Sequence, residues 1–341
     1  MAHRQARLVR KEGQCVANHK YDFYFSETGG CECQAPEMPA RLVMGGWPAR
    51  GTVYENDRLS IGYTRCRPVS DGMGPEIRSG ISVLAFPTRG LFRMHIRNET
   101  HVCDPNVVIF QNANDVFRTS HPDTIGDDTV WLTFREDVVQ DVVREHDASV
   151  DDRPGSPFPF TIGQLESNVF LLMRALFNEA NRGPDADRVL IEETSIELLG
   201  EAFSTAHQAR MAMARPSRNT TLRAHREMAE AARGYMAAHL HSRLSIHQIA
   251  SQVHCSPYHL CRLFRRQTGM PVHRYLNRLR LRAAVDRLQE HRADLAKLAQ
   301  DLGFASHSHF CDAFRREFGA PPSVMRQRLT DLRSVVETIH E

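Results

Sequence analysis

The 341-residue sequence has no apolar run near the ~20 residues that a membrane-spanning helix needs. Its longest candidate, residues 170–177, is interrupted by Arg174. The basic start, residues 1–13, precedes no apolar segment of the kind that secretory signals contain. We therefore expect a cytoplasmic protein that does not bind membranes. Eight cysteines are dispersed along the chain, which predicts reduced thiols rather than a disulfide framework.

Lysine is scarce in the last third of the chain. Residues 221–341 contain 19 Lys and Arg residues, of which only Lys297 is a lysine, against 11 Asp and Glu residues. This segment has a net charge of +8 and residues 1–220 have a net charge of −6, although the whole chain carries only +2. Because guanidinium groups pair bidentately with phosphates and guanine edges, the arginine-rich third is predicted to bind nucleic acid.

The first two thirds of the sequence predict an irregular arm followed by a β-rich domain. Residues 1–50 contain glycines and prolines without sustained periodicity, which indicates the arm. Residues 51–210 alternate short β-branched and aromatic runs with turn clusters, as a β-barrel or sandwich does, and end in helical periodicity. The predicted strands are 59–63, 81–86, 91–96, 107–110 and 130–134; the predicted helices are 136–146, 162–181 and 187–207, the last two forming an antiparallel hairpin. Residues 214–220 are polar and contain Pro216, so we expect a linker at residues 211–221.

One pattern occurs twice after the linker. An amphipathic segment leads to a turn, a serine and a second amphipathic segment that ends in glycine. From the serine onward the copies align at an offset of 50, as in Ser256 and Ser306 or Gly269 and Gly319, and before it the offset is 49. Serine caps helix N-termini and glycine ends helices, so each copy predicts a helix-turn-helix.

The segment between the copies, residues 272–291, has helical periodicity. About 19 helical residues span roughly 28 Å, close to the ~34 Å between successive major grooves on one face of B-DNA. We therefore expect one chain to place both second helices in adjacent grooves of double-stranded DNA.

At this point residues 225–330 resemble the two-motif DNA-binding domain of AraC/XylS-type transcriptional regulators. The segments that carry the resemblance are 250–266 (ASQVHCSPYHLCRLFRR) and 302–322 (LGFASHSHFCDAFRREFGAPP). It implies a sequence-specific transcriptional regulator, expected to be an activator that works with RNA polymerase. It also implies a cupin-like β-barrel that senses a small-molecule effector and a helical hairpin that forms a homodimer. The expected protein is thus of the α+β class, with the sensing and dimerisation domain at 51–210 and an all-α DNA-binding domain at 222–332.

The resemblance further implies which side chains reach the DNA. Base contacts are expected from the early exposed positions of each second helix, and the basic side chains of the same faces are expected at phosphates. Asp312 departs from the family's pattern, in which a basic or neutral side chain often stands at this position. A carboxylate can accept a hydrogen bond from cytosine but repels phosphate. The full predicted set is Tyr258, Cys261, Arg262, Arg265, Arg266, His307, Ser308, Cys311, Asp312, Arg315 and Arg316.

Several residues allow other interpretations, but no cofactor and no metal site is predicted. The spacing of His254, Cys255, His259 and Cys261 resembles zinc ligands, yet the second copy has no equivalent of Cys255. Cys31 and Cys33, with Cys15 nearby, leave a metal or redox role open beside the simpler interpretation of reduced thiols in an irregular arm.

The alternative function is a cupin-type metalloenzyme or small-molecule-binding protein with an attached DNA-binding module. His95 and His101 lack the close His-x-His spacing of enzymatic cupins, and no phosphate loop or nucleophile elbow is present, so we expect no enzyme. Aromatic side chains of the β-rich region either line an effector pocket or form ordinary core: Tyr54, Tyr63, Phe86, Phe92 and Trp131.

Overall fold

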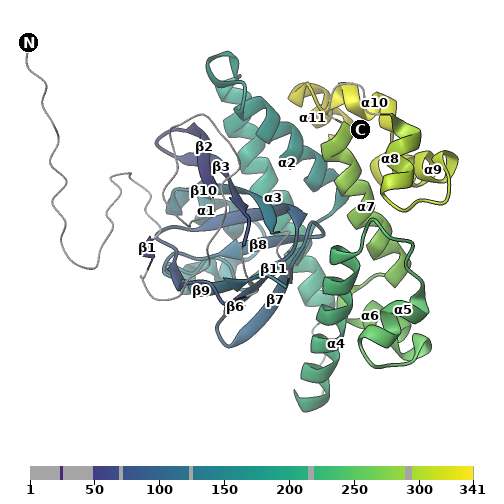
Figure 1. Cartoon of the computed structure of the whole chain (residues 1–341). Coiled ribbons are helices and arrows are strands. Elements are labelled where there is room, and N and C mark those ends of the chain that lie inside the picture. The colour runs from purple at the N-terminus through teal and green to yellow at the C-terminus, as the bar shows by residue number, and fades with distance from the viewer. Residues whose placement is uncertain are drawn as a thin grey trace, which may run out of the picture.

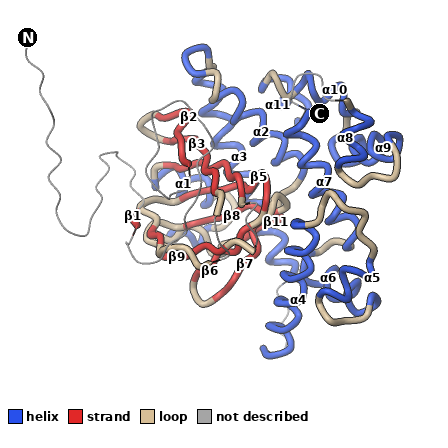
Figure 2. Tube along the Cα trace, viewed as in Figure 1, coloured by secondary structure: helices blue, strands red, loops and turns tan. Residues whose placement is uncertain are grey.

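The computed structural model describes residues 24–25, 49–68, 72–122, 126–213, 219–288 and 294–340. Strands gather on one side of the molecule and the C-terminal helices on the other (Figures 1 and 2). Cys15, Cys31 and Cys33 of the predicted arm lie outside the described residues, as do residues 214–218 of the predicted linker. In the part of the chain that the structure describes, no helix combines the length and the apolar composition needed to cross a bilayer.

The strands form two antiparallel sheets. The order in the first is β1 (Tyr24–Phe25), β4 (Ile77–Arg78), β9 (Val116–Ser120), β6 (Phe92–Ile96) and β7 (Glu99–Cys103). The order in the second is β11 (Ile162–Gln164), β8 (Val107–Gln111), β5 (Val83–Gly90), β10 (Asp127–Phe134), β3 (Leu59–Cys66) and β2 (Ala49–Glu55). All five predicted strand runs are present with shifted ends. The structure has an open pair of sheets where a closed barrel was predicted, because no pairing between described strands joins the two sheets.

The β6–β7 hairpin shows how local sequence sets this arrangement. Phe92, Met94 and Ile96 are buried between the sheets, while the intervening side chains are only partly covered, as strand alternation requires. Arg97 and Asn98 connect the strands with φ of 51° and 60°, the two left-handed residues of a type I′ turn. Strands β6 and β7 therefore form a tight antiparallel hairpin.

Helices cover the outer face of the second sheet. They are α1 (Glu136–Arg144), α2 (Ser167–Ala180) and α3 (Arg188–Met213), with short 3-10 segments at Ala148–Asp152 and Gly183–Asp185. The predicted hairpin of α2 and α3 is confirmed, but the predicted helix 162–181 is wrong at its start. Residues 162–164 pair with β8 as strand β11, where a Cβ on Gly163 would lie 2.5 Å from the Cβ of Ala206. Sheet pairing at this close approach overrides the helical periodicity.

The predicted linker is also too long at both ends. Helix α3 continues to Met213 and α4 (Asn219–Ala238) begins six residues later. Met and Ala favour helix, so residues 211–213 extend α3 to within three residues of Pro216.

The C-terminal helices form two helix-turn-helix units separated by one long helix. The first unit is α5 (Ile246–Gln252) and α6 (Pro257–Thr268), and the second is α8 (Leu295–Asp301) and α9 (His307–Phe318). Between them runs α7 (Val272–Leu288), as predicted apart from residues 289–291, which lie outside the described residues. Helices α10 (Pro322–Arg328) and α11 (Leu332–His340) follow, and α11 packs against α2.

Apolar packing joins the two halves of the chain. Leu91 and Val102 of the sheets belong to the core of α4 and the first unit. The second unit shares one continuous core with α1, α2, α3 and the outer face of the second sheet. Each helix-turn-helix unit is thus seated on a different part of the N-terminal half.

Candidate nucleic-acid interface and its attachment to the sheets

Both second helices begin and end where the sequence predicts. The Ser256 hydroxyl accepts from the backbone N–H of His259 at 3.2 Å, and the Ser306 hydroxyl accepts from that of His309 at 3.1 Å. Gly269 and Gly319 end α6 and α9 with φ of 73° and 75°, a left-handed conformation that glycine adopts without a Cβ penalty. The capping predictions are confirmed at all four ends.

The turns confirm the change of offset between the copies. His254 and Gly303, which align at 49, have φ of 53° and 72°. After them the backbone N–H of Cys255 donates to the carbonyl of Ala250 at 3.1 Å, and that of Phe304 donates to the carbonyl of Ala299 at 3.0 Å. The second turn then contains one additional residue before its serine.

The eleven side chains that the resemblance assigned to DNA contact lie on the outward side of α6 and α9. Ten are exposed and Cys311 is half-buried, whereas Leu260, Phe264, Phe310 and Phe314 of the same helices are buried. The two helices lie at the edge of the molecule away from the sheets, with α7 between them (Figure 1). The structure therefore gathers the predicted residues on two outward helix faces.

The basic side chains on these faces are available to an external partner. Within the described residues, Arg262, Arg265, Arg266, Arg315 and Arg316 form no ion pair with a carboxylate of the chain. Their neighbours are local: the Arg262 guanidinium lies 5.7 Å from the centre of the Tyr258 ring, and Arg316 Nε donates to the backbone oxygen of Asp312 at 3.2 Å. In the second helix, Cys311 Sγ lies 3.4 Å from His307 Nε2.

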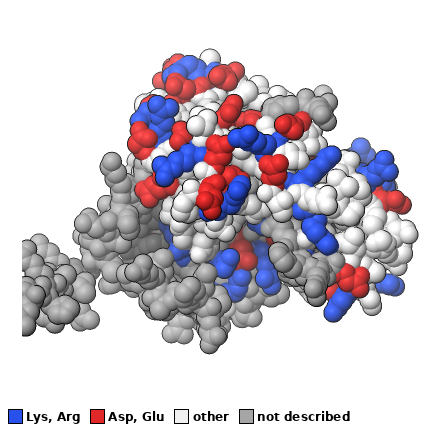
Figure 3. All heavy atoms as spheres, turned by 90° about the horizontal axis from the view of Figure 1, so that it is seen from above, with Lys and Arg blue, Asp and Glu red and all other residues white. Residues whose placement is uncertain are grey.

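The charge of the C-terminal third overstates this basic surface, because several of its arginines are buried. The exposed fractions of Arg278, Arg280 and Arg282 are 3%, 7% and 0%, although all three count toward the net charge of this segment. On the face seen in Figure 3, Lys and Arg side chains alternate with Asp and Glu side chains and form no single basic area. Net charge alone thus does not locate the interface.

Arg278 and Arg280 form hydrogen bonds that connect α7 to neighbouring elements. Arg278 Nε donates to Glu317 of α9 at 2.5 Å and its Nη2 donates to Glu166 at 2.7 Å. Burial lowers the pKa of Arg278, but both carboxylates more than compensate and raise it. Arg280 donates to the carbonyls of Leu240 and Ser242 at 2.9 and 2.6 Å and so holds the end of α4 against α7.

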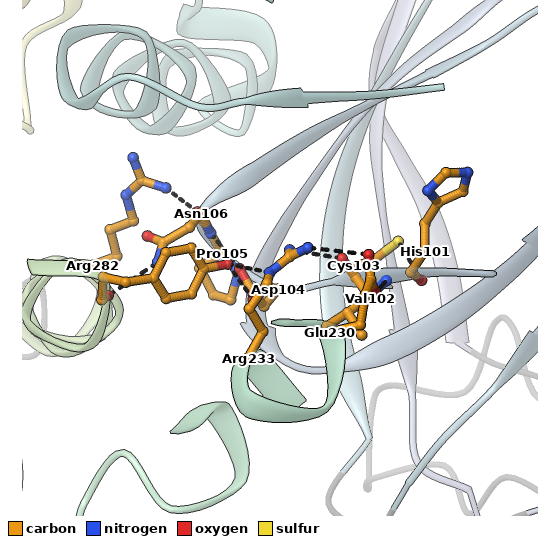
Figure 4. A network of polar contacts seen from close by, with 10 residues as sticks. His101, Val102, Cys103, Asp104, Pro105, Asn106, Glu230, Arg233 and Arg282 are labelled. Atoms are coloured by element: carbon orange, nitrogen blue, oxygen red, sulfur yellow. Dashed lines mark hydrogen bonds and ion pairs between the residues drawn. The ribbon is translucent and has the colours of Figure 1, made fainter. Parts of the chain in front are cut away.

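Arg282 reaches from α7 into the N-terminal half. Its guanidinium donates to the carbonyls of Pro105 and Leu165, and Asn106 Nδ2 donates in return to the carbonyl of Tyr275 at 3.1 Å (Figure 4). Burial, followed by repulsion from Arg278, lowers the pKa of Arg282 to about 9. Backbone carbonyls rather than a carboxylate offset the desolvation of this cation. Arg282 therefore stabilises the protein only while the N-terminal half holds these carbonyls against α7.

A second buried group lies beside it. Arg233 of α4 donates to the Tyr275 hydroxyl at 2.7 Å and to the carbonyl of Val102 at 2.8 Å, and it lies 3.4 Å from Asp104 (Figure 4). The Tyr275 hydroxyl donates to Asp104 at 2.6 Å. Glu230 accepts from the backbone N–H of Val102 at 2.5 Å, and burial raises the pKa of this glutamate. These contacts tie α4 and α7 to the β7–β8 connection.

Residues 164–167, from the last residue of β11 to the first of α2, contact helices α6, α7 and α9. Gln164 donates to the carbonyl of Thr268 at the end of α6, and the carbonyl of Leu165 accepts from α7. Glu166 pairs with α7, and Ser167 donates to Glu317 of α9. Residues 164–167 therefore contact the C-terminal ends of α6 and α9 and helix α7 between them.

A cavity lies between the sheets. Its volume is about 160 Å³, and its apolar wall includes Phe92 and Trp131 of the predicted aromatic set. The other three aromatics lie elsewhere: Phe86 is in the core under the helices, Tyr54 donates to Glu192 of α3, and Tyr63 packs edge-on against Phe177. The Trp131 indole N–H is buried and has no hydrogen-bond acceptor among the described residues. The Arg50 guanidinium lies 4.6 Å from the Trp131 ring centre, and burial lowers its pKa to about 10.

The polar end of this cavity contains residues that the sequence interpretation missed. Cys66, His121 and Asp127 line it and are all buried. Their positions in the sequence show no ligand spacing, because Cys66 ends β3 and Asp127 begins β10. Only the register of that strand pair places them opposite each other. His95, by contrast, bonds Thr100 and Ser120 on its own sheet.

Comparison with known proteins matches the C-terminal half. Residues 249–328 match a family described as a helix-turn-helix domain. The regulatory protein PocR of Salmonella typhimurium is 33% identical over 97 residues, which are 28% of this chain and 32% of PocR. The HTH-type transcriptional activator RhaS of Escherichia coli O157:H7 is 40% identical over 79 residues, 23% of this chain and 28% of RhaS. The matched segment thus spans about a third of the length of these curated relatives.

Among solved structures, ToxT from Vibrio cholerae O395 aligns over 80% of this chain and 98% of its own, with a TM-score of 0.32 and 12% sequence identity.

Proposed function

We propose that this chain is a sequence-specific DNA-binding transcriptional regulator of the AraC/XylS type, because residues 249–328 match a helix-turn-helix domain family and PocR, which is similar over 97 residues, is named a regulatory protein. The observation that supports it most is the pair of capped, outward-facing helices α6 and α9, whose five arginines have no carboxylate partner among the described residues. The 17 residues of α7 separate the two helices. At ~1.5 Å per residue, such a rod spans about 26 Å, near the spacing of successive major grooves.

We assign base readout to the exposed early positions of each helix. Tyr258, Cys261 and Arg262 in α6, and His307, Ser308, Cys311 and Asp312 in α9, present their side chains outward. The later basic positions would contact phosphates: Arg265, Arg266, Arg315 and Arg316. Asp312 places an anion where α6 has Arg262, so α6 should supply more of the affinity and α9 more of the discrimination.

The N-terminal half would regulate this interface. The cavity between the sheets has apolar walls, an indole donor without an acceptor among the described residues and the half-buried Arg50 guanidinium, which suits a small apolar effector with an acceptor group. Cavity-lining Ile109 and Gln111 lie on β8, and Ile109 pairs with Ile162 of β11. A shift of β8 on effector binding would move β11 and residues 164–167, and would thereby change the position of α6 relative to α9.

The chain would act as a homodimer in the cytoplasm. Helix α3 exposes Val189 and Ile196, one heptad apart, with exposed fractions of 75% and 39%. An apolar stripe at this spacing suits helix-to-helix pairing with a second copy. RhaS is named as an activator, and by that likeness we propose activation in contact with RNA polymerase.

Footprinting of the full chain on genomic fragments, followed by binding measurements on the mapped duplex, tests the proposal. Arg262→Ala should weaken binding to that site by about 1–3 kcal/mol, roughly 5- to 150-fold in Kd, without changing the unfolding temperature. Arg58→Ala, an exposed arginine between β2 and β3, is the matched control and should bind like the parent. No protected site, or equal affinity of Arg262→Ala and the parent, would contradict the assignment.

A further inference from the structure

We propose that Cys66, His121 and Asp127 form a binding site for a divalent transition-metal ion of the zinc class, with one coordination position open to the cavity between the sheets. The cluster brings together a thiol sulfur, a ring nitrogen and a carboxylate oxygen, all within 4.8 Å of one another. Among the described residues, no other group of three such side chains meets at this distance.

The three side chains come from three strand ends, one of them on the opposite sheet. Cys66 at the end of β3 is the register partner of Asp127 at the start of β10. His121 directly follows β9 of the first sheet, and its Nε2 lies 2.7 Å from Asp127 Oδ1. Their convergence therefore depends on both sheets being in place, which makes it a rigid arrangement rather than a property of one loop.

The donor set and spacing suit a tetrahedral ion. Zinc bonds of about 2.3 Å to sulfur and 2.0–2.2 Å to nitrogen or oxygen place ligand atoms roughly 3.3–3.7 Å apart. The three donors lie within 4.8 Å of one another, so small side-chain rotations close the site, and the ion displaces to solvent the proton shared by His121 and Asp127. The Cys66 thiol loses its proton to solvent as it binds, so affinity falls at lower pH.

Neighbouring groups hold the cluster in place. Thr129 donates to Asp127 Oδ2 at 2.9 Å, which leaves Oδ1 directed at the other two residues. Gly126 has φ of +74°, and a Cβ there would lie 2.0 Å from the carbonyl oxygen of Cys66. Glycine at this position lets the chain run against β3 just before Asp127, and a larger residue would push the two ligands apart.

The cavity beside the cluster gives an independent indication that a ligand binds here. Trp131 lines the same cavity, and its buried indole N–H has no acceptor among the described side chains and backbone groups. A buried donor without a partner is costly unless a bound molecule satisfies it. Three protein ligands with a fourth position facing such a cavity match the pattern of an open rather than a closed metal site.

Metal titration of the full chain tests this site without any DNA. The parent for this experiment carries Cys15→Ser, Cys31→Ser and Cys33→Ser, so that thiols of the first 50 residues cannot contribute. We expect one equivalent of Co²⁺ to bind and to produce thiolate-to-metal charge-transfer absorption, and Zn²⁺ to displace it. Zn²⁺ should also raise the unfolding temperature, because it binds only the folded chain.

Variants separate the cluster from other thiols. Cys66→Ser should abolish the charge-transfer absorption, and Asp127→Asn should weaken binding at least tenfold. Cys103→Ser is the matched control, since Cys103 is also buried between the sheets but lies outside the cluster. It should bind as the parent does.

The proposal is overturned if the parent shows no saturable binding at one equivalent, or if Cys66→Ser keeps the absorption. If Cys66→Ser does not fold, unchanged affinity in Asp127→Asn overturns it equally. Because none of these measurements involves DNA, their failure leaves the proposed regulatory function intact.

Discussion

Asp104→Asn is expected to loosen the attachment of the helix-turn-helix half to the sheets. Asp104 is fully buried, accepts from the Tyr275 hydroxyl at 2.6 Å and lies 3.4 Å from the Arg233 guanidinium. Asparagine has one acceptor oxygen, which keeps the 2.9 Å bond from the backbone N–H of Asn106, and its amide nitrogen replaces the oxygen that accepts from Tyr275. The substitution thus removes one charge and one hydrogen bond from the contact between the halves and keeps the hydrogen bond within the β7–β8 connection.

The magnitude follows from the distances. With an effective dielectric constant of ~20, two unit charges 3.4 Å apart interact by about 5 kcal/mol. Glu230 remains 3.6 Å from the same guanidinium and retains part of that compensation. We therefore expect a loss of about 2–3 kcal/mol, at or below the roughly 3–5 kcal/mol that removing one partner of a buried pair costs, and this corresponds to roughly 30- to 150-fold in Kd between the halves.

The assay uses a protease site inserted between Met213 and Asn219, after the last residue of α3 and before the first of α4. After cleavage, dissociation of the two fluorescently labelled halves is measured for the parent and for Asp104→Asn. The control is Asp141→Asn, which removes an exposed partner of Arg144 within α1. Equal Kd values for Asp104→Asn and the parent, or an equal loss in the control, would refute the assigned role of this buried group.

Three further outcomes are expected. Asp312→Arg should strengthen binding to random duplex and steepen its salt dependence by about one unit, measured by anisotropy at two salt concentrations; weaker binding would show that this face of α9 does not approach phosphates. Burial raises the pKa of Glu317, but the positive charge of Arg278 more than offsets this effect, so the pKa of Glu317 lies below its usual 4.5. Its contribution to stability is present above that pH and lost as the pH falls through the folded value, so the urea-midpoint gap between Glu317→Gln and the parent should shrink on acidification; a constant gap contradicts the pairing. Ile196→Arg should convert a dimer to a monomer in sedimentation equilibrium, and an unchanged dimer would exclude this part of α3 from the interface.

Local interactions explain why the helix-turn-helix units were predictable from the sequence. Ser256 and Ser306 cap backbone groups three residues away, and Gly269 and Gly319 end their helices within one turn. Because such contacts span only a few residues, the repeat, the offset of its turns and the outward faces of α6 and α9 all follow from the pattern. The alternation of β6 and its two-residue turn were predictable for the same reason.

Contacts between residues far apart in the sequence were decided only by the tertiary structure. The net charge of the segment counts Arg278, Arg280 and Arg282 together with the arginines of α6 and α9, because a buried and an exposed guanidinium look alike in one sequence. Their burial depends on carbonyls and carboxylates supplied by other elements, as the more than one hundred residues between Arg282 and Leu165 illustrate. Cys66 and Asp127 likewise meet through strand register alone. The sequence by itself therefore determined which segments form the two capped helix-turn-helix units, whereas burial and sheet register decided which side chains hold those units to the N-terminal half and which converge in its cavity.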